Sequence, residues 1–231
     1  MKVTLLQHTP DPETAVALAA RLCYSPVGID ELREKLSKSD IAAFLDKIMS
    51  LGHQSVLEHA SFTFGIEGIS RATSHQLVRH RLASYSQQSQ RYVTHVERFP
   101  AVVPPTIAER PELAARFEEQ LKALHETYAA LVAAGIPAED ARYILPNAAE
   151  TKIIVTMNGR ELLHFFELRC CERAQWEIRA MAVEMLRLVK AVAPTIFRDA
   201  GPGCLVGPCP EGTMTCGKIV AVRQRFKEMS A

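Results

Sequence analysis

The sequence predicts a single α+β domain over residues 1–231, with a small, mostly antiparallel sheet flanked by helices. Three observations lead to this prediction. Several segments repeat apolar residues with the period of a helix, only a few show strand patterns, and the order lacks regular βαβ alternation. The hydrophobic fraction of 48% and the charged fraction of 23% are ordinary for a globular protein, and the length allows a substantial core.

Each element of the first half is predicted from a capping residue or an apolar pattern. The predicted elements are a strand at 2–7, a helix at 11–23, a helix from Ser39 to Gly52, a strand at 61–66 and a helix at 70–82. Asp11 is expected to cap the first of these helices, with Pro12 in its first turn. The residues SFTFGI at 61–66 alternate as a half-buried strand does.

In the second half of the chain, glycine and proline residues mark the ends of the predicted elements more clearly. The predicted elements are a helix at 112–134, a short helix from Pro137 to Pro146, a strand at 152–157, and helices at 159–170 and 176–192. Gly135 is expected to close the long helix, and KIIVTM at 152–157 has the character of a buried strand. Residues 200–217 are rich in Gly, Pro and Cys and are predicted to form a loop.

Charge and composition narrow the classes of function. The net charge of +1 argues against a general nucleic-acid coat, so no nucleic acid polymer is expected as a partner. The apolar run before Pro10 is too short for a signal peptide, and no stretch approaches transmembrane length. We therefore expect a cytoplasmic protein without a membrane partner, whose six cysteines stay reduced.

The most polar segment is RHRLASYSQQSQRY at 79–92, which holds three arginines, a histidine, three serines and three glutamines. Such groups are costly to bury unless something polar satisfies them. Arginine forks match phosphate oxygens, and hydroxyl and amide groups can complete the shell around a phosphate or a base. The plainer interpretation, a solvated basic face followed by a polar loop, leaves the clustering of Ser and Gln unexplained.

On the predicted helix at 70–82, the side chains of Arg79 and Arg81 would lie about 160° apart, while Gln76 and Arg79 would lie about 60° apart. The two arginines would then face different ways. Either the segment contacts two ligands, or one arginine serves a ligand and the other a neighbouring subunit.

A second polar group begins where the strand at 152–157 ends, with Asn158, Arg160, His164 and Arg169. Arg160 and His164 would share one helix face, whereas Arg169 would be rotated from His164 by about 140°. This group is a candidate anion or cofactor surface, with ordinary surface charges as the alternative.

No metal site is predicted. His53, Glu58 and His59 lack the HExxH spacing, and either stacking on an aromatic ligand or a structural role explains His53 as well. The spacings of Cys204, Cys209 and Cys216 match no standard zinc pattern, so a loop that packs its cysteines is preferred.

These residues resemble one family, the flavin-dependent thymidylate synthases. Its signature is RHR, seven residues, then Ser, and it stands complete here as Arg79, His80, Arg81 and Ser89. Three further blocks are similar, GHQSVLEH at 52–59, NGRELLHFFELR at 158–169 and AQWEIR at 174–179. The resemblance implies the thymidylate synthase-complementing protein fold and reductive methylation of dUMP to dTMP. It also implies 5,10-methylenetetrahydrofolate as carbon donor, FAD as hydride carrier, NADPH as reductant, and a homotetramer with active sites between subunits.

By position in the family pattern, two sets of residues are implied as ligands. The FAD set is His53, Ser55, Arg79, His80, Arg81, Gln87, Asn158, Arg160 and His164. The dUMP set is Gln76, Arg79, Gln87, Gln88, Ser89, Gln90, Arg91 and Arg142. Gln87 stands where some members carry Glu.

Arg169 matches the arginine that favours ionisation at N3 of the uracil, and a fixed guanidinium there would stabilise negative charge on the ring. Ser89 could be a covalent nucleophile, but the sequence places no histidine or lysine to deprotonate it. We therefore expect Ser89 to orient dUMP. The competing functions, an RNA-binding module and a metal-dependent nucleotide hydrolase built on His53, Glu58 and His59, fit the neutral charge and the histidine spacing less well.

Overall fold

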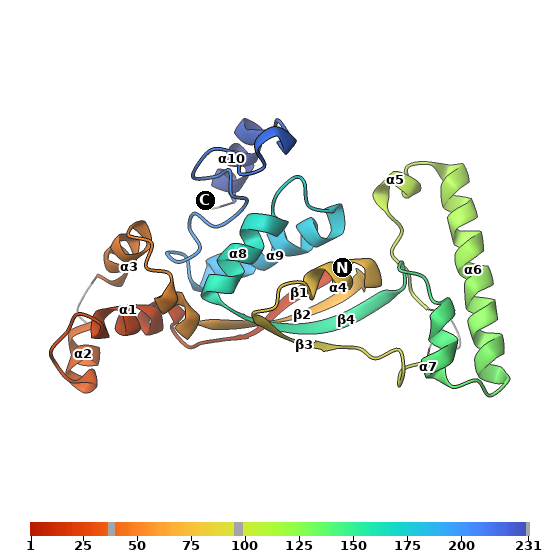
Figure 1. The fold of residues 1–231 in the computed structure, drawn as a ribbon, viewed down its shortest axis with the longest axis horizontal. Coiled ribbons are helices and arrows are strands. Elements are labelled where there is room, and N and C mark those ends of the chain that lie inside the picture. Colours follow the sequence, from red (N-terminus) through yellow and green to blue (C-terminus); the bar gives the residue numbers. More distant parts are fainter. Residues whose placement is uncertain (37–39, 95–98, 230–231) are drawn as a thin grey trace. The chain divides into compact units, whose positions relative to one another are not determined.

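The protein is described by a computed structural model that covers residues 1–36, 40–94 and 99–229. Figure 1 shows the course of the chain through its helices and strands. The strands are β1 (Lys2–His8), β2 (Ser61–Ser70), β3 (Ala83–Gln87) and β4 (Glu150–Asn158). The helices are α1 (Pro12–Leu22), α2 (Ile29–Leu36), α3 (Ile41–Ser50), η1 (Ser55–His59), α4 (Arg71–Leu77), α5 (Pro105–Ala108), α6 (Pro111–Ala133), α7 (Ala138–Ala141), η2 (Arg142–Ile144), α8 (Gly159–Arg169), α9 (Trp176–Val192), η3 (Gly212–Met214) and α10 (Ile219–Glu228).

The sheet has the strand order β1-β2-β4-β3. Its strands are antiparallel, as shown where the start of β2 meets the end of β1 through Thr9 N and Ser61 O at 2.9 Å. The predicted α+β fold with a small antiparallel sheet is therefore confirmed. No helix in the described part of the chain is both long and apolar enough to cross a bilayer.

Backbone contacts divide this fold into two compact units. The first unit comprises Met1–Lys2, Ile66–Arg79 and Tyr85–Ile154, and the second comprises Val3–Gly65, His80–Ser84 and Val155–Ala231. Strands β2 and β4 contribute residues to both. That residues 1–231 act as one functional domain stays a prediction.

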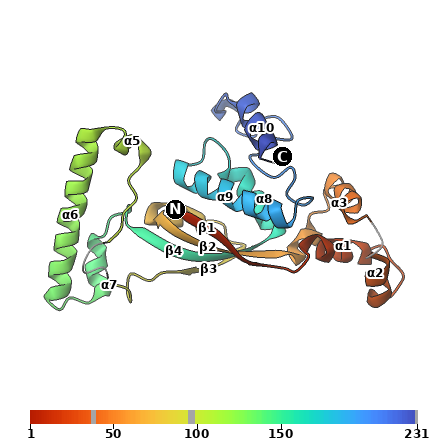
Figure 2. The same cartoon turned by 180° about the vertical axis from the view of Figure 1, so that it is seen from behind.

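The second unit holds most of the buried apolar core. The side chains of Phe62, Phe166 and Phe197 meet edge to face, with ring centroids 5.4 Å apart between Phe62 and Phe197 and 6.0 Å apart between Phe166 and Phe197. Strand β2 and helix α8 are joined by this aromatic cluster. Figures 1 and 2 show α8 and α9 side by side over the strands of this unit, and the two helices are in direct contact.

In the first unit, the long helix α6 packs against α7 and η2. A smaller core of Phe99, Leu121 and Ala149 lies under α6, with Phe117 and Leu124 packed against it. The predicted closing residue, Gly135, has φ +83, a left-handed conformation that glycine adopts without strain.

Two capping predictions have different outcomes. Asp11 precedes α1, but its side chain makes no capping hydrogen bond and its backbone is left-handed at φ 42, so the predicted cap is wrong. Ser39, predicted to start the next helix, lies outside the described residues. Asp40 caps α3 by accepting the N–H of Ala43 at 3.0 Å.

The helix predicted at 70–82 is wrong in its second half. The helix begins after Ser70, whose side chain caps it, but α4 ends at Leu77, and Ala83–Gln87 form strand β3. The chain pairs with β4 beyond this point, where Gln88 N donates to Lys152 O at 2.9 Å. No glycine or proline marks the change, and strand pairing outweighs local helix propensity here. The 160° angle expected between Arg79 and Arg81 therefore has no basis, because both residues follow the helix.

Candidate functional site

The most enclosed polar group of the second unit is built around His80. This residue is 5% exposed and lies between two side chains of α8. Its Nδ1 is 3.3 Å from Glu161 Oε1, and its Nε2 accepts a hydrogen bond from Arg169 Nε at 2.9 Å. The ring of Phe165 packs edge-on against it, with centroids 4.9 Å apart. The central histidine of the RHR signature and the predicted catalytic arginine are thus in direct contact.

The partners of His80 fix its protonation state. An arginine Nε can only donate, so His80 Nε2 must be unprotonated and the hydrogen must sit on Nδ1, where it faces Glu161. Burial first, and then the positive charge of Arg169 and the nearby His164, lower the pKa of His80 to about 4. Burial raises the pKa of the Glu161 carboxyl. The histidine is therefore neutral at ordinary pH and acts as an acceptor for Arg169.

The start of α8 forms a second part of this unit. Asn158 caps the helix by accepting the N–H of Glu161 at 2.9 Å, and the predicted flavin ligand Arg160 pairs with Glu58 at 2.6 Å. Gly159 lies so close to η1 that a Cβ there would be 2.9 Å from Leu57 O. The chain needs glycine at this approach, which holds the GHQSVLEH segment against the first turn of α8.

The other predicted flavin ligands of the second unit are solvent-facing. The side chains of His53, Ser55, Arg81 and His164 are exposed. The ring of His164 lies 6.1 Å from that of His80, centroid to centroid, so it borders the His80 group. No described group of three or more His, Cys, Asp or Glu side chains, His53, Glu58 and His59 included, is arranged to hold a metal ion.

In the first unit, Gln87 is held at the end of β3. Its Nε2 donates to Ser74 Oγ at 2.9 Å and to Thr151 Oγ1 at 3.1 Å. The side-chain amide nitrogen of Gln87 is thus bound to α4 and β4. These two bonds fix the orientation of the side-chain amide, including its oxygen. The next residue, Gln88, continues the strand pairing through its backbone.

Two arginines contact Glu139 in the first unit, and a third lies near one of them. Arg91 forms an ion pair with the Glu139 carboxylate, and Arg142 Nε donates to the Glu139 carbonyl at 3.0 Å. Arg71, at the start of α4, has its pKa lowered by burial and then by the charge of Arg142. The Glu139 carboxylate pairs with Arg91 alone, so the charges of Arg142 and Arg71 leave local positive charge, which suits an anion.

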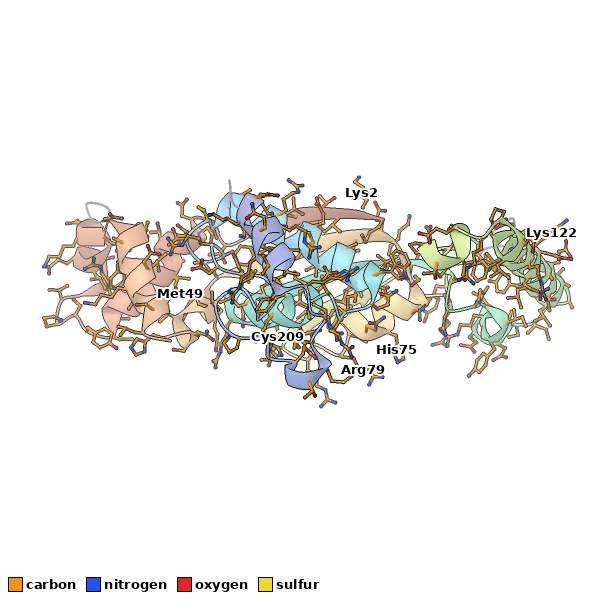
Figure 3. The ribbon with its side chains drawn as sticks, turned by 90° about the horizontal axis from the view of Figure 1, so that it is seen from above. Lys2, Met49, His75, Arg79, Lys122 and Cys209 are labelled. Atoms are coloured by element: carbon orange, nitrogen blue, oxygen red, sulfur yellow. The ribbon has the colours of Figure 1, made fainter. Side chains whose placement is uncertain are left out.

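The remaining predicted dUMP ligands make local contacts. Ser89 Oγ accepts the backbone N–H of Arg91 at 3.1 Å, and Gln76 Nε2 donates to Ala72 O at 3.4 Å. Arg79 Nη2 lies 3.2 Å from His75 Nε2, and Figure 3 shows these two side chains together. Gln90 is half-buried.

The two predicted ligand sets separate between the units. Every member of the dUMP set lies in the first unit, whereas the FAD set lies in the second unit apart from Arg79 and Gln87. Within the units, the structure joins His80 to Arg169, and Arg91 to Arg142. It gives no direct contact between Arg81 and these groups among the described residues.

Sequence reasoning missed three residues of these groups, Glu161, Arg71 and Glu139. Glu161 lies inside the NGRELLHFFELR block, but nothing local marks it as the partner of a histidine 81 positions earlier. Arg71 lies outside every motif, and only its packing near Arg142 sets it apart. In the sequence, Glu161 shares a predicted helix face with Leu162 and Phe165, and a glutamate that is buried there needs a polar partner.

Comparison with known proteins agrees with this geometry. The family model described as "Thymidylate synthase complementing protein" matches residues 4–195. The chain is 76% identical over its full length, and that of the relative, to a protein of Geobacter sulfurreducens named flavin-dependent thymidylate synthase. Proteins of the same name from Clostridium tetani and Pyrococcus horikoshii are 49% and 47% identical, and the matches cover at least 97% of each chain.

The chain belongs to the family of thymidylate synthase complementing proteins. The resemblance inferred from the RHR signature and the three outlying blocks is therefore confirmed.

Proposed function

We propose that the protein is a flavin-dependent enzyme of thymidylate synthesis that methylates dUMP reductively to dTMP. In this proposal 5,10-methylenetetrahydrofolate gives the carbon, and NADPH is the final reductant. The observation that carries the proposal is the contact between His80 of the signature and Arg169, because it places a fixed cation beside the motif that defines the family.

The residues of the second unit fit FAD. His53 before η1, Ser55 at its start and Arg160 in the first turn of α8 have exposed side chains, and the N-terminal end of the eleven-residue helix α8 favours negative charge. Arg81 and His164 are exposed donors in the same unit. When bound, FAD supplies the hydride chemistry. The protein's part is to hold the cofactor with these donors and with Asn158.

The residues of the first unit fit the phosphate of dUMP. Burial lowers the pKa of Arg71 most, and repulsion by the positive charge of Arg142 lowers it further. An anion beside Arg91 and Arg142 would offset this repulsion and would share the role now filled by Glu139. Gln87, Gln88 and Gln90 follow on β3 and the turn after it, where amide groups can meet the base or sugar.

Arg169 is proposed as the catalytic residue. Attack by C5 of uracil requires negative charge to develop on the ring, and a guanidinium near N3 and O2 would stabilise it. His80 fixes the direction of that guanidinium by accepting from Nε. Since Arg169 is only half-exposed, its charge is less screened by water than that of a surface arginine.

Ser89 is proposed to orient dUMP without attacking it. Its hydroxyl oxygen accepts the N–H of Arg91, which shapes the turn after β3. That arrangement supports Arg91 as a ligand and gives the hydroxyl no base. The serine of the signature would then act by placing its neighbours.

We further propose a cytoplasmic homotetramer whose active sites form between subunits, with residues 1–231 as one functional domain. Large apolar side chains near the signature support an interface, because Leu82 is 70% exposed, Tyr92 78% and Tyr143 86%. Light scattering of the purified protein coupled to gel filtration tests this state. A monomer at micromolar concentration would contradict it.

The activity is tested by purifying the protein and recording its visible spectrum with and without dUMP. We expect a yellow protein that converts dUMP to dTMP only when NADPH and methylenetetrahydrofolate are both present. A colourless protein that takes up no added FAD would overturn the proposal.

A further inference from the structure

The C-terminal loop at 200–217 brings together cysteines that the sequence keeps apart. Cys204, Cys209 and Cys216 come from this loop, and Cys171 comes from the connection between α8 and α9. All four line one cavity of about 270 Å³ within the second unit. All are free thiols. Figure 3 marks Cys209 in the segment that leads to α10.

The loop is held in place firmly enough to make this grouping meaningful. Arg223 of α10 donates to Cys204 O at 2.8 Å and to Gly207 O at 2.7 Å. A Cβ on Gly203 would lie 2.9 Å from Glu167 Oε1, so the loop runs directly against α8. On the other side, Arg225 of α10 pairs with Glu172 at 2.7 Å, next to Cys171. Contacts from α8 and α10 thus fix both walls of the cavity.

The neighbouring cysteine shows what ordinary packing would look like. Cys170 is fully buried in the core, as an apolar thiol is expected to be. Cys171, Cys209 and Cys216 are only partly buried, and they face a hollow instead of filling the core. Cys204 is buried and lines the same hollow as the other three. Packing of apolar thiols in the core, which accounts for Cys170, does not account for four thiols that line one cavity.

We propose that Cys171, Cys204, Cys209 and Cys216 form a structural zinc site that ties the C-terminal loop to the end of α8. Four thiolates satisfy the tetrahedral preference of Zn²⁺ completely, leaving no open position for catalysis. Binding releases the four thiol protons and forms four zinc–sulfur bonds. The guanidinium groups of Arg223 and Arg225 stand beside the site and offset its negative charge.

The thiols must move to bind the metal, because no described set of three side chains stands in ligating geometry. The loop permits this closure. Gly212 and Gly217, at φ +52 and φ +72, place tight turns between Cys209 and Cys216 and directly after Cys216. The motion needed is rotation of the thiol side chains and a shift of the stretch from Cys209 to Cys216, which lies outside the contacts that Arg223 makes with Cys204 and Gly207. The site is independent of dUMP and FAD binding, so its test does not depend on the proposed activity.

The test is the metal content of the untagged full-length protein, purified without chelator and measured by inductively coupled plasma mass spectrometry. We expect about one zinc per chain. Cys209→Ser and Cys216→Ser should each lose it. Cys23→Ser is the matched control, since Cys23 is an exposed cysteine at the end of α1, and it should keep its zinc. Iron in place of zinc, or zinc retained in both loop variants, would overturn the proposal.

A second measurement on the unaltered protein covers the case in which the variants do not fold. Cysteines are alkylated in the native protein before and after zinc is removed with a strong chelator, and each site is read by peptide mass spectrometry. The three partly buried cysteines, Cys171, Cys209 and Cys216, should be protected until the metal leaves, while Cys23 reacts in both states. Equal labelling in both states, or a disulfide between cavity cysteines in metal-free protein as purified, would contradict a zinc site.

Discussion

The two units hold their polar residues in opposite ways. In the second unit, His80 is enclosed by Glu161, Arg169 and Phe165, and each contact fixes the next. In the first unit, Arg91 and Arg142 share Glu139 near the surface, with no enclosing apolar wall. An enclosed network loses much when one member is removed, whereas a surface cluster loses the charge of that member alone. Variants in the two units should therefore differ in size and kind of effect.

The largest effect is expected for Arg169→Ala. Loss of a preorganised cation at the developing charge should lower turnover by about 100- to 1000-fold, with FAD content nearly unchanged. Steady-state kinetics and the flavin absorbance measure the two quantities. The control is Arg187→Ala, which removes an exposed arginine paired with Glu184 on α9. Near-normal turnover in Arg169→Ala would show that the proposed role at uracil N3 is wrong.

The second largest effect is expected on the pH dependence of the free energy of unfolding, through His80. The pKa of His80 falls from 6.5 to about 4 on folding, so the unfolded chain binds this proton more tightly. The contribution is complete above pH 6.5 and is lost as the pH falls toward 4. It amounts to at most about 3 kcal/mol of unfolding free energy.

Urea unfolding at several pH values measures this contribution, with His80→Asn as the comparison. The groups that face His80 are Glu161, Arg169 and His164, and the raised pKa of Glu161 acts in the opposite direction because its protonated form is favoured in the fold. If the variant shows the same loss of stability between pH 6.5 and 4 as the original protein, His80 is not its source.

A smaller effect is expected for Arg142→Ala in the first unit. Loss of one charge-assisted contact to the phosphate should raise the KM for dUMP about tenfold and leave FAD retention unchanged. Arg116→Ala, which removes an exposed arginine of α6, is the matched control. A drop in FAD content with unchanged KM would mean that the two units do not divide the ligands as proposed.

Arg81→Ala should weaken FAD binding by about fivefold, which is the upper range for an exposed charge. Titration of the flavin-free protein with FAD, followed by flavin fluorescence, gives the dissociation constant. The KM for dUMP should stay the same. An unchanged FAD affinity would remove Arg81 from the cofactor set.

The smallest effect is expected for Ser89→Ala. Its hydroxyl accepts one backbone N–H, so its loss should reduce turnover by about threefold to fivefold through the turn that carries Arg91. A rapid-quench assay with excess enzyme detects low residual rates. Complete inactivity with intact dUMP binding would instead support a nucleophilic serine.

The sequence predicts the elements that have local boundaries. Asn158 and Gln175 cap α8 and α9, and the predicted ranges of both helices agree with the structure to within one residue. The strand predicted at 152–157 is also correct, and its buried residues occupy alternate positions. Helix α10 was missed, although Val222 and Phe226 are buried on one of its faces, because the cysteine-rich loop before it masks its start.

The segment between Ser70 and Gln87 was predicted only in part, for a physical reason. The residues ASYSQ of β3 have no strong apolar alternation, and their conformation depends on pairing with β4, far away in sequence. The same limit applies to the site. The signature identifies His80 and the block at 158–169 identifies Arg169, but their 2.9 Å contact and the role of Glu161 depend on how β4 and α8 fold back.

The aromatic cluster of Phe62, Phe166 and Phe197 has a practical consequence for how this chain can be shortened. The family match ends at residue 195, two positions before Phe197, whose ring closes the core between β2 and α8. A gene cut at the end of the match would encode a protein with a hole at its centre and an apolar surface open to aggregation. The region that defines the family by sequence is therefore shorter than the smallest piece that can be expected to express as a folded protein.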